Sequence, residues 1–100
     1  MRNYQVGDIV YYMYRYSSTF PVFFKVTKVS DKSVWVTEVD KAHTNITPGY
    51  ASYDCSPVPE REIGRNRRVS IRPNGYAYIK AYYTERLEPW DGRVISGYSD

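Results

Sequence analysis

Residues 9–16 read Ile9-Val10-Tyr11-Tyr12-Met13-Tyr14-Arg15-Tyr16, a run in which most side chains are aromatic or β-branched. Such side chains suit the pleated, half-buried surface of a β-sheet. Successive side chains of a strand point to opposite faces, so the run places Tyr12, Tyr14 and Tyr16 together on one face. Residues 9–16 therefore predict a strand that carries a row of tyrosines.

Two further strands are predicted after this one, at residues 22–29 and 33–39. Proline cannot donate a backbone hydrogen bond to a neighbouring strand, so Pro21 argues against a central-strand position before residue 22. Val29 has the opposite parity to Val26, and this change of parity indicates a bulge near Thr27. The first 39 residues thus predict three short strands.

A second hairpin is predicted around Pro73-Asn74-Gly75, the strongest turn signal in the chain. Asparagine and glycine tolerate the positive φ angles that tight turns require. The turn joins predicted strands at residues 68–72 and 76–83, and residues 84–88 predict a single helical turn. Five short strands in a 100-residue chain predict one mainly β domain over residues 1–100. We expect either a small SH3-like barrel or a strongly curved antiparallel sheet.

Residues 40–66 differ in character from the strands on both sides. They hold three prolines and two glycines among many polar residues. The composition predicts one long polar loop. Loops of this length are unusual in compact domains, so the segment is expected to be functional, to be mobile or to contain a short element.

Composition excludes several classes of protein. A single cysteine rules out an internal disulfide framework, and no apolar run reaches the length of a membrane span. The first residues lack the apolar stretch of a signal peptide, so a soluble protein of the cytoplasm is expected. The net charge of +3 is compatible with an anionic partner but does not require one.

The chain offers little for catalysis. Its only histidine, His43, and its only thiol, Cys55, both fall in the predicted loop, and a nucleophilic pair needs a third group and a fixed geometry. Two such ligands are too few for zinc, and the glycines are too scattered for a phosphate-binding loop. The sequence therefore predicts no enzyme activity, no metal and no cofactor.

The densest group of like charges is a run of five arginines within twelve residues: Arg61, Arg65, Arg67, Arg68 and Arg72. Guanidinium groups bind phosphates through paired hydrogen bonds and stack on bases. The same cluster can instead serve only solubility, because two glutamates lie beside it. We take it as a candidate site for an anionic partner.

Tyrosine is the most over-represented residue, with twelve copies in 100 residues. Tyrosine buries area at low entropic cost and keeps a hydroxyl for hydrogen bonding, which suits binding surfaces. Alternatively, the rings only cover the sheet or fill the core. The rows that would form an aromatic contact surface are Tyr12, Tyr14 and Tyr16 on one strand and Tyr76, Tyr78 and Tyr82 on another.

Two stretches resemble a family of small, mostly uncharacterised proteins from bacteriophages and other mobile elements. The first runs from residue 4 to residue 10, Tyr-Gln-Val-Gly-Asp-Ile-Val, with aromatic and valine-rich segments at residues 23–29 and 32–36 after it. The second is Trp90-Asp91-Gly92-Arg93. The resemblance implies a phage or plasmid origin and a role in countering host defence or regulating a host process. It implies no established reaction.

Two binding hypotheses follow. In the first, a phage-type module binds nucleic acid or a signalling nucleotide, with tyrosines stacking on bases and arginines holding phosphates. In the second, the protein inhibits a host defence nuclease or another effector protein through a tyrosine-rich contact surface. An aromatic edge strand would also allow a homodimer.

Overall fold

The computed structural model describes residues 4–16, 18–50, 52–81 and 83–99. Within these ranges the chain is mainly β, as predicted, and contains no α-helix. Eight strands and one 3-10 helix form, in place of the five strands expected. They are β1 (Ile9–Arg15), β2 (Ser18–Val29), β3 (Ser33–Thr44), η1 (Pro48–Tyr50), β4 (Ser52–Ser70), β5 (Tyr78–Lys80), β6 (Thr84–Arg86), β7 (Glu88–Pro89) and β8 (Ile95–Ser99).

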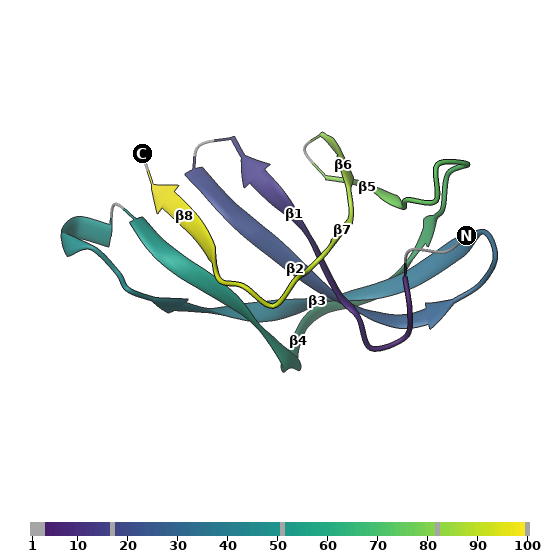
Figure 1. Cartoon of the computed structure of the whole chain (residues 1–100), viewed down its shortest axis with the longest axis horizontal. Coiled ribbons are helices and arrows are strands. Elements are labelled where there is room, and N and C mark those ends of the chain that lie inside the picture. The colour runs from purple at the N-terminus through teal and green to yellow at the C-terminus, as the bar shows by residue number, and fades with distance from the viewer. Residues whose placement is uncertain (1–3, 17, 51, 82, 100) are drawn as a thin grey trace.

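Six of the strands form one antiparallel sheet in the order β3-β4-β8-β2-β1-β7 (Figure 1). β3 also pairs with β2, so β2, β3, β4 and β8 are hydrogen-bonded in a ring, while β1 and β7 extend the sheet beyond it. β5 and β6 form a separate two-stranded hairpin. The sheet is therefore partly closed.

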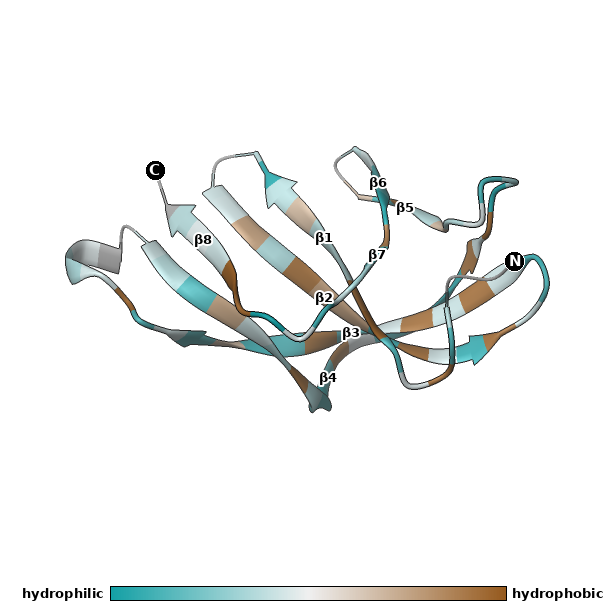
Figure 2. Cartoon of the chain, viewed as in Figure 1, coloured by the Kyte–Doolittle hydropathy of each residue, from teal (hydrophilic) through white to brown (hydrophobic). Residues whose placement is uncertain are grey.

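The main core lies on one face of β1, β2 and β3. Val10, Phe24, Val26 and Val36 are buried there, as is Ile79 of the β5–β6 hairpin, which covers this face. Figure 2 shows hydrophobic and paler bands alternating along β2 and β3, as expected when one face of each strand is buried. The predicted bulge near Thr27 is confirmed by a shift in the β2–β3 register between Val26 and Lys28.

A second, smaller core lies on the opposite face of the same strands. Phe23 and Val39 are buried there with Cys55 of β4, and Trp90 packs against them. The rings of Phe23 and Trp90 meet edge to face, with centroids 6.2 Å apart. Both faces of β2 are therefore buried near its middle, which accounts for the consecutive apolar residues in that strand.

The prediction of a long loop over residues 40–66 is wrong. β3 continues to Thr44 and β4 begins at Ser52, so most of the segment belongs to two long paired strands. The β3–β4 register jumps between the pairs Val39–Glu62 and Asp40–Val58. Three more residues stand on β4 than on β3 at this point, and the strand forms the sharp corner seen below β3 in Figure 1.

Two smaller expectations are also corrected. Residues 84–88 form β6 and the start of β7 rather than a helical turn. The second strand begins at Ser18, before Pro21, rather than at residue 22. The pairings of β2 with β8 and with β3 stop at Thr19 and Phe23, so Pro21 lies where β2 pairs only with β1.

Candidate anion-binding surface

Three side chains form a row across the outer face of the sheet, one each from β2, β3 and β4. Trp35 is the cross-strand partner of Lys28 on one side and of Arg68 on the other, so the three share a face. Lys28 Nζ lies 4.6 Å and Arg68 Cζ 6.0 Å from the centroid of the Trp35 ring, within reach of cation–π attraction. Val34 and Val36 flank Trp35 along β3 and are fully buried, so the row faces away from the main core.

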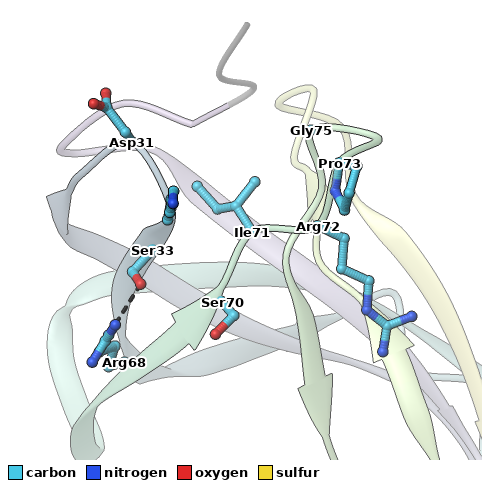
Figure 3. A pocket seen from close by; sticks show the side chains of 9 residues that line it. Asp31, Ser33, Arg68, Ser70, Ile71, Arg72, Pro73 and Gly75 are labelled. Carbon is cyan, nitrogen blue, oxygen red and sulfur yellow. Dashed lines mark hydrogen bonds between the residues drawn. The ribbon is translucent and has the colours of Figure 1, made fainter.

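A hollow of about 770 Å³ lies beside this row, between the β2–β3 turn and the turn after β4 (Figure 3). Ile71 N–H donates to the Lys32 carbonyl oxygen at 2.8 Å and so joins the two walls. Arg68 Nε–H donates to Ser33 Oγ at 3.0 Å, which fixes the guanidinium at the rim. Lys32, Arg68 and Arg72 all line this hollow, and it is therefore suited to an anion.

A second hollow of about 300 Å³ lies on the other side of residues 67–72. Arg67 and Lys80 line it, and Arg68 and Arg72 line both hollows. The guanidinium carbon of Arg72 lies 4.1 Å from the centroid of the Tyr78 ring. Arg67 is the cross-strand partner of the buried Val36, so it lies on the core side of β4, whereas Arg68 lies on the outer side with Trp35. We call the six cations around Trp35 and the two hollows, on both sides of this end of β4, the basic face: Lys28, Lys32, Arg67, Arg68, Arg72 and Lys80.

Negative charge is sparse around the basic face. Asp31 is the one carboxylate among the described residues that line the two hollows. The exposed Ser70 adds a hydroxyl group that can donate to a phosphate oxygen. The face therefore carries a clear excess of positive charge, which raises the local concentration of anions.

The five arginines of the sequence cluster do not form one site. The structure brings Arg67, Arg68 and Arg72 together on the basic face and leaves Arg61 and Arg65 at the β4 corner. Arg61 Nη1 forms an ion pair with Asp40 Oδ2 at 3.2 Å. The Lys41 backbone N–H donates to Asp40 Oδ1 at 2.8 Å, and this bond together with the Arg61 pair holds the pKa of the Asp40 carboxyl below its usual value.

The tyrosine rows do not form an outward-facing platform. Tyr12 and Tyr14 stack on Phe24 and Phe20 and pack against the main core. Tyr76 also packs against this core, and Tyr78 lies beneath Arg72. Tyr16 alone of the predicted residues that the structure describes is strongly exposed, at 61%. Tyr82 lies outside the described residues.

His43 and Cys55 are closer together than the loop prediction implied, because they are direct cross-strand partners on β3 and β4. Cys55 is fully buried, and burial raises the pKa of its thiol. A nucleophilic cysteine needs a lowered pKa, so the shift runs against that role. The His43 ring packs against Tyr53, with centroids 4.5 Å apart.

Sequence reasoning missed several residues of this surface: Lys28, Lys32, Trp35 and Lys80. One signal was present, because Trp35 has the opposite parity to the buried valines on either side of it. Aromatic side chains beside basic residues occur on surfaces that bind single-stranded nucleic acid. The cross-strand partners of Trp35 could not be read from the sequence without the register of β2, β3 and β4.

Two general features complete the description. The residues that the structure describes contain no helix of the length and hydropathy needed to cross a membrane. Nor do they contain a group of three or more histidine, cysteine or acidic side chains placed to hold a metal ion. Comparison of the chain with protein-family models, with curated proteins and with solved structures found no match.

Proposed function

We propose that the protein is a non-enzymatic binding module that holds the phosphates of a nucleic acid or nucleotide on its basic face. The observation that carries the proposal is the position of Arg68. This residue lines both hollows and is also the cross-strand partner of Trp35. One guanidinium thus joins two cationic hollows to an aromatic ring.

The chemistry of the face supports this function. Arginine binds phosphate oxygens through paired N–H groups and is weakly hydrated, so it releases water readily when it binds. Ser33 already orients Arg68, which lowers the entropic cost of ordering this side chain around a ligand. All three arginines of the face are exposed, so an incoming phosphate meets them without unfolding any strand.

Salt dependence tests the proposal. We expect a labelled oligonucleotide or polyphosphate to bind at about 50 mM salt and to lose affinity steeply as salt increases, because phosphate contacts release counterions. If three to six cations contact phosphates, the slope of log K against log salt is about −2 to −4 for a single strand. Fluorescence anisotropy across a salt series measures this slope.

A matched pair of variants separates the basic face from general charge. Arg68→Ala removes the shared guanidinium, whereas Arg93→Ala removes the same charge from a side chain that lines neither hollow and is 87% exposed. Arg68→Ala should weaken binding about tenfold and make the salt slope shallower by about 0.7, and Arg93→Ala should change little. Equal losses in both variants would contradict a defined site.

A second candidate function is inhibition of a host defence protein by a phage-type protein with an SH3-like barrel. The edge of β1 favours it, because among the described residues β7 pairs with Val10 and Tyr11 and no strand pairs with this edge at residues 12–15. Exposed Tyr16 and Tyr83 line a small hollow beside this edge. Edge strands of this kind accept a strand from another protein. A pull-down from nuclease-treated host lysate tests this function. Capture of a single host protein by the wild type, and its loss with Tyr16→Ala, would support it.

A further inference from the structure

We infer that the ligand of the basic face is an unpaired nucleic-acid strand, with a base stacked beside Trp35 and the adjoining phosphates held by Lys28 and Arg68. The inference rests on the proposed function and narrows its ligand class. It depends on the Lys28–Trp35–Arg68 row, on the shape of the two hollows and on the polar residues next to the row.

The row alternates charge and aromatic surface in the order that a single strand requires. Bases stack on aromatic rings whatever their sequence, and the phosphates on both sides of a stacked base need cations. Lys28 and Arg68 lie on opposite sides of Trp35, on the neighbouring strands β2 and β4. Lys28 Nζ lies over the Trp35 ring, so a base that stacks on this ring takes the place of the ammonium group, which then meets the adjoining phosphate. A nucleotide unit that crosses the three strands would therefore contact a cation, a ring and a second cation.

The hollows favour a strand over a free nucleotide. Small-molecule sites enclose most of the ligand surface. Here the two hollows lie on opposite sides of residues 67–72 and share Arg68 and Arg72 at their rims. Two hollows that share the Arg68 and Arg72 side chains suit a polymer that continues from one hollow to the next.

Trp35 favours a single strand over a duplex. In a duplex the flat faces of the bases are covered by their neighbours, so only phosphates and groove edges are available. A duplex would then use the cations and leave the Trp35 ring without a role. Unpaired bases expose their faces, and only they can use the aromatic surface between Lys28 and Arg68.

Asn66 adds a hydrogen-bonding group beside the row. Its side-chain oxygen accepts from the Thr27 hydroxyl at 2.7 Å and from the Thr37 hydroxyl at 3.1 Å. These two bonds fix the orientation of the amide, which leaves its NH₂ group for an acceptor on a ligand. An acceptor on the edge of the stacked base meets this requirement.

The chain provides an internal reporter for the test. Trp35 and Trp90 are its two tryptophans, and Trp90 packs in the second core with its indole N–H donating to the Arg93 carbonyl oxygen. In Trp90→Phe the fluorescence comes from Trp35 alone. A stacked base should quench it, whereas polyphosphate should bind without comparable quenching.

The experiment titrates Trp90→Phe with a ten-nucleotide thymidine strand, with a duplex of the same length, with a mononucleotide and with polyphosphate. We expect quenching by the single strand, and at least tenfold weaker binding of the duplex and of the mononucleotide. If the duplex or the mononucleotide binds as tightly as the single strand, the inference is overturned but the proposed function stands. Failure of all four ligands to bind at low salt overturns the proposed function itself.

A variant of the ring provides the second measurement. Trp35→Leu keeps an apolar side chain but removes the aromatic face. In the wild-type background it should weaken single-strand binding by about five- to hundredfold and leave polyphosphate binding unchanged. Thermal melting establishes that the variant folds. Equal losses for the two ligands in a folded variant would show that Trp35 acts only by supporting the cations, which contradicts stacking.

Discussion

The Tyr4 hydroxyl donates a hydrogen bond to the Leu87 carbonyl oxygen at 2.7 Å, across 83 positions of sequence. The same hydroxyl accepts from the Ala77 N–H at 2.8 Å. Ala77 and Leu87 are fully buried and are themselves joined by a backbone hydrogen bond. A single side chain near the N-terminus therefore attaches the segment that carries β5 and β6 to the main core.

Tyr4→Phe should lower the free energy of unfolding by about 1–3 kcal/mol. The ring would still fill its site, but the Ala77 N–H would lose its partner in a buried place, and an unsatisfied buried group costs about this much. Urea unfolding followed by tryptophan fluorescence measures the change. Tyr98→Phe is the matched control, because Tyr98 is 54% exposed and its hydroxyl group should contribute less than about 0.5 kcal/mol.

Stability should fall between pH 10 and pH 12. Burial raises the pKa of Tyr4 from 10.0 to about 12, so in this range the unfolded chain loses the phenolic proton while the folded chain keeps it. The stabilising effect is complete below pH 10 and is lost as the pH rises through the folded-state pKa. Two pH units correspond to about 2–3 kcal/mol. Between pH 9 and pH 11.5 the free energy of unfolding should decrease more for the wild type than for Tyr4→Phe. Parallel curves for the two proteins would contradict this origin.

Gly97→Ala should destabilise the contact of β8 with β2 and β4. A Cβ atom at Gly97 would lie 2.8 Å from the Thr19 carbonyl oxygen and 2.9 Å from the Tyr53 ring. Such overpacking costs about 1–3 kcal/mol. Thermal melting measures the loss, with Ser96→Ala as the neighbouring control. A melting temperature equal to that of the control would show that β8 can shift without cost.

The parts of the fold that follow from local pattern could be predicted from the sequence. The alternation of apolar residues places β1 and the end of β2, and the parity of Val29 locates the bulge near Thr27. The turn at Pro73-Asn74-Gly75 also forms, with Gly75 at positive φ. Each of these features depends on residues a few positions apart, and for that reason a single sequence reveals them.

The rest depends on pairing between distant segments. Pro57 and Pro59 indicate a loop, yet they lie in β4, where β8 pairs only with Ser52–Cys55 and the edge beyond lacks a described strand partner. Proline is tolerated on such an edge. The Lys28–Trp35–Arg68 row is likewise built from three strands, and no spacing along the chain shows that these residues are neighbours.

Asp31→Asn should strengthen the binding of polyanions. Of the residues that the structure describes, Asp31 is the one carboxylate that lines either hollow, and it shares the larger one with Lys32, Arg68 and Arg72. Repulsion between two charges at an exposed site is about 1 kcal/mol or less and is screened by salt. Affinity should therefore rise about two- to fivefold at 50 mM salt, and the gain should disappear near 0.5 M.

The matched control for this gain is Asp91→Asn, which changes the net charge equally. Asp91 lies in the connection between β7 and β8, lines neither hollow and is 67% exposed. If anions bind the basic face, Asp31→Asn gains affinity and Asp91→Asn does not, because the screening length of about 10 Å limits the influence of a distant charge. An equal gain in both variants would mean that polyanions respond to net charge alone, and the larger hollow would then not be the place where phosphates bind.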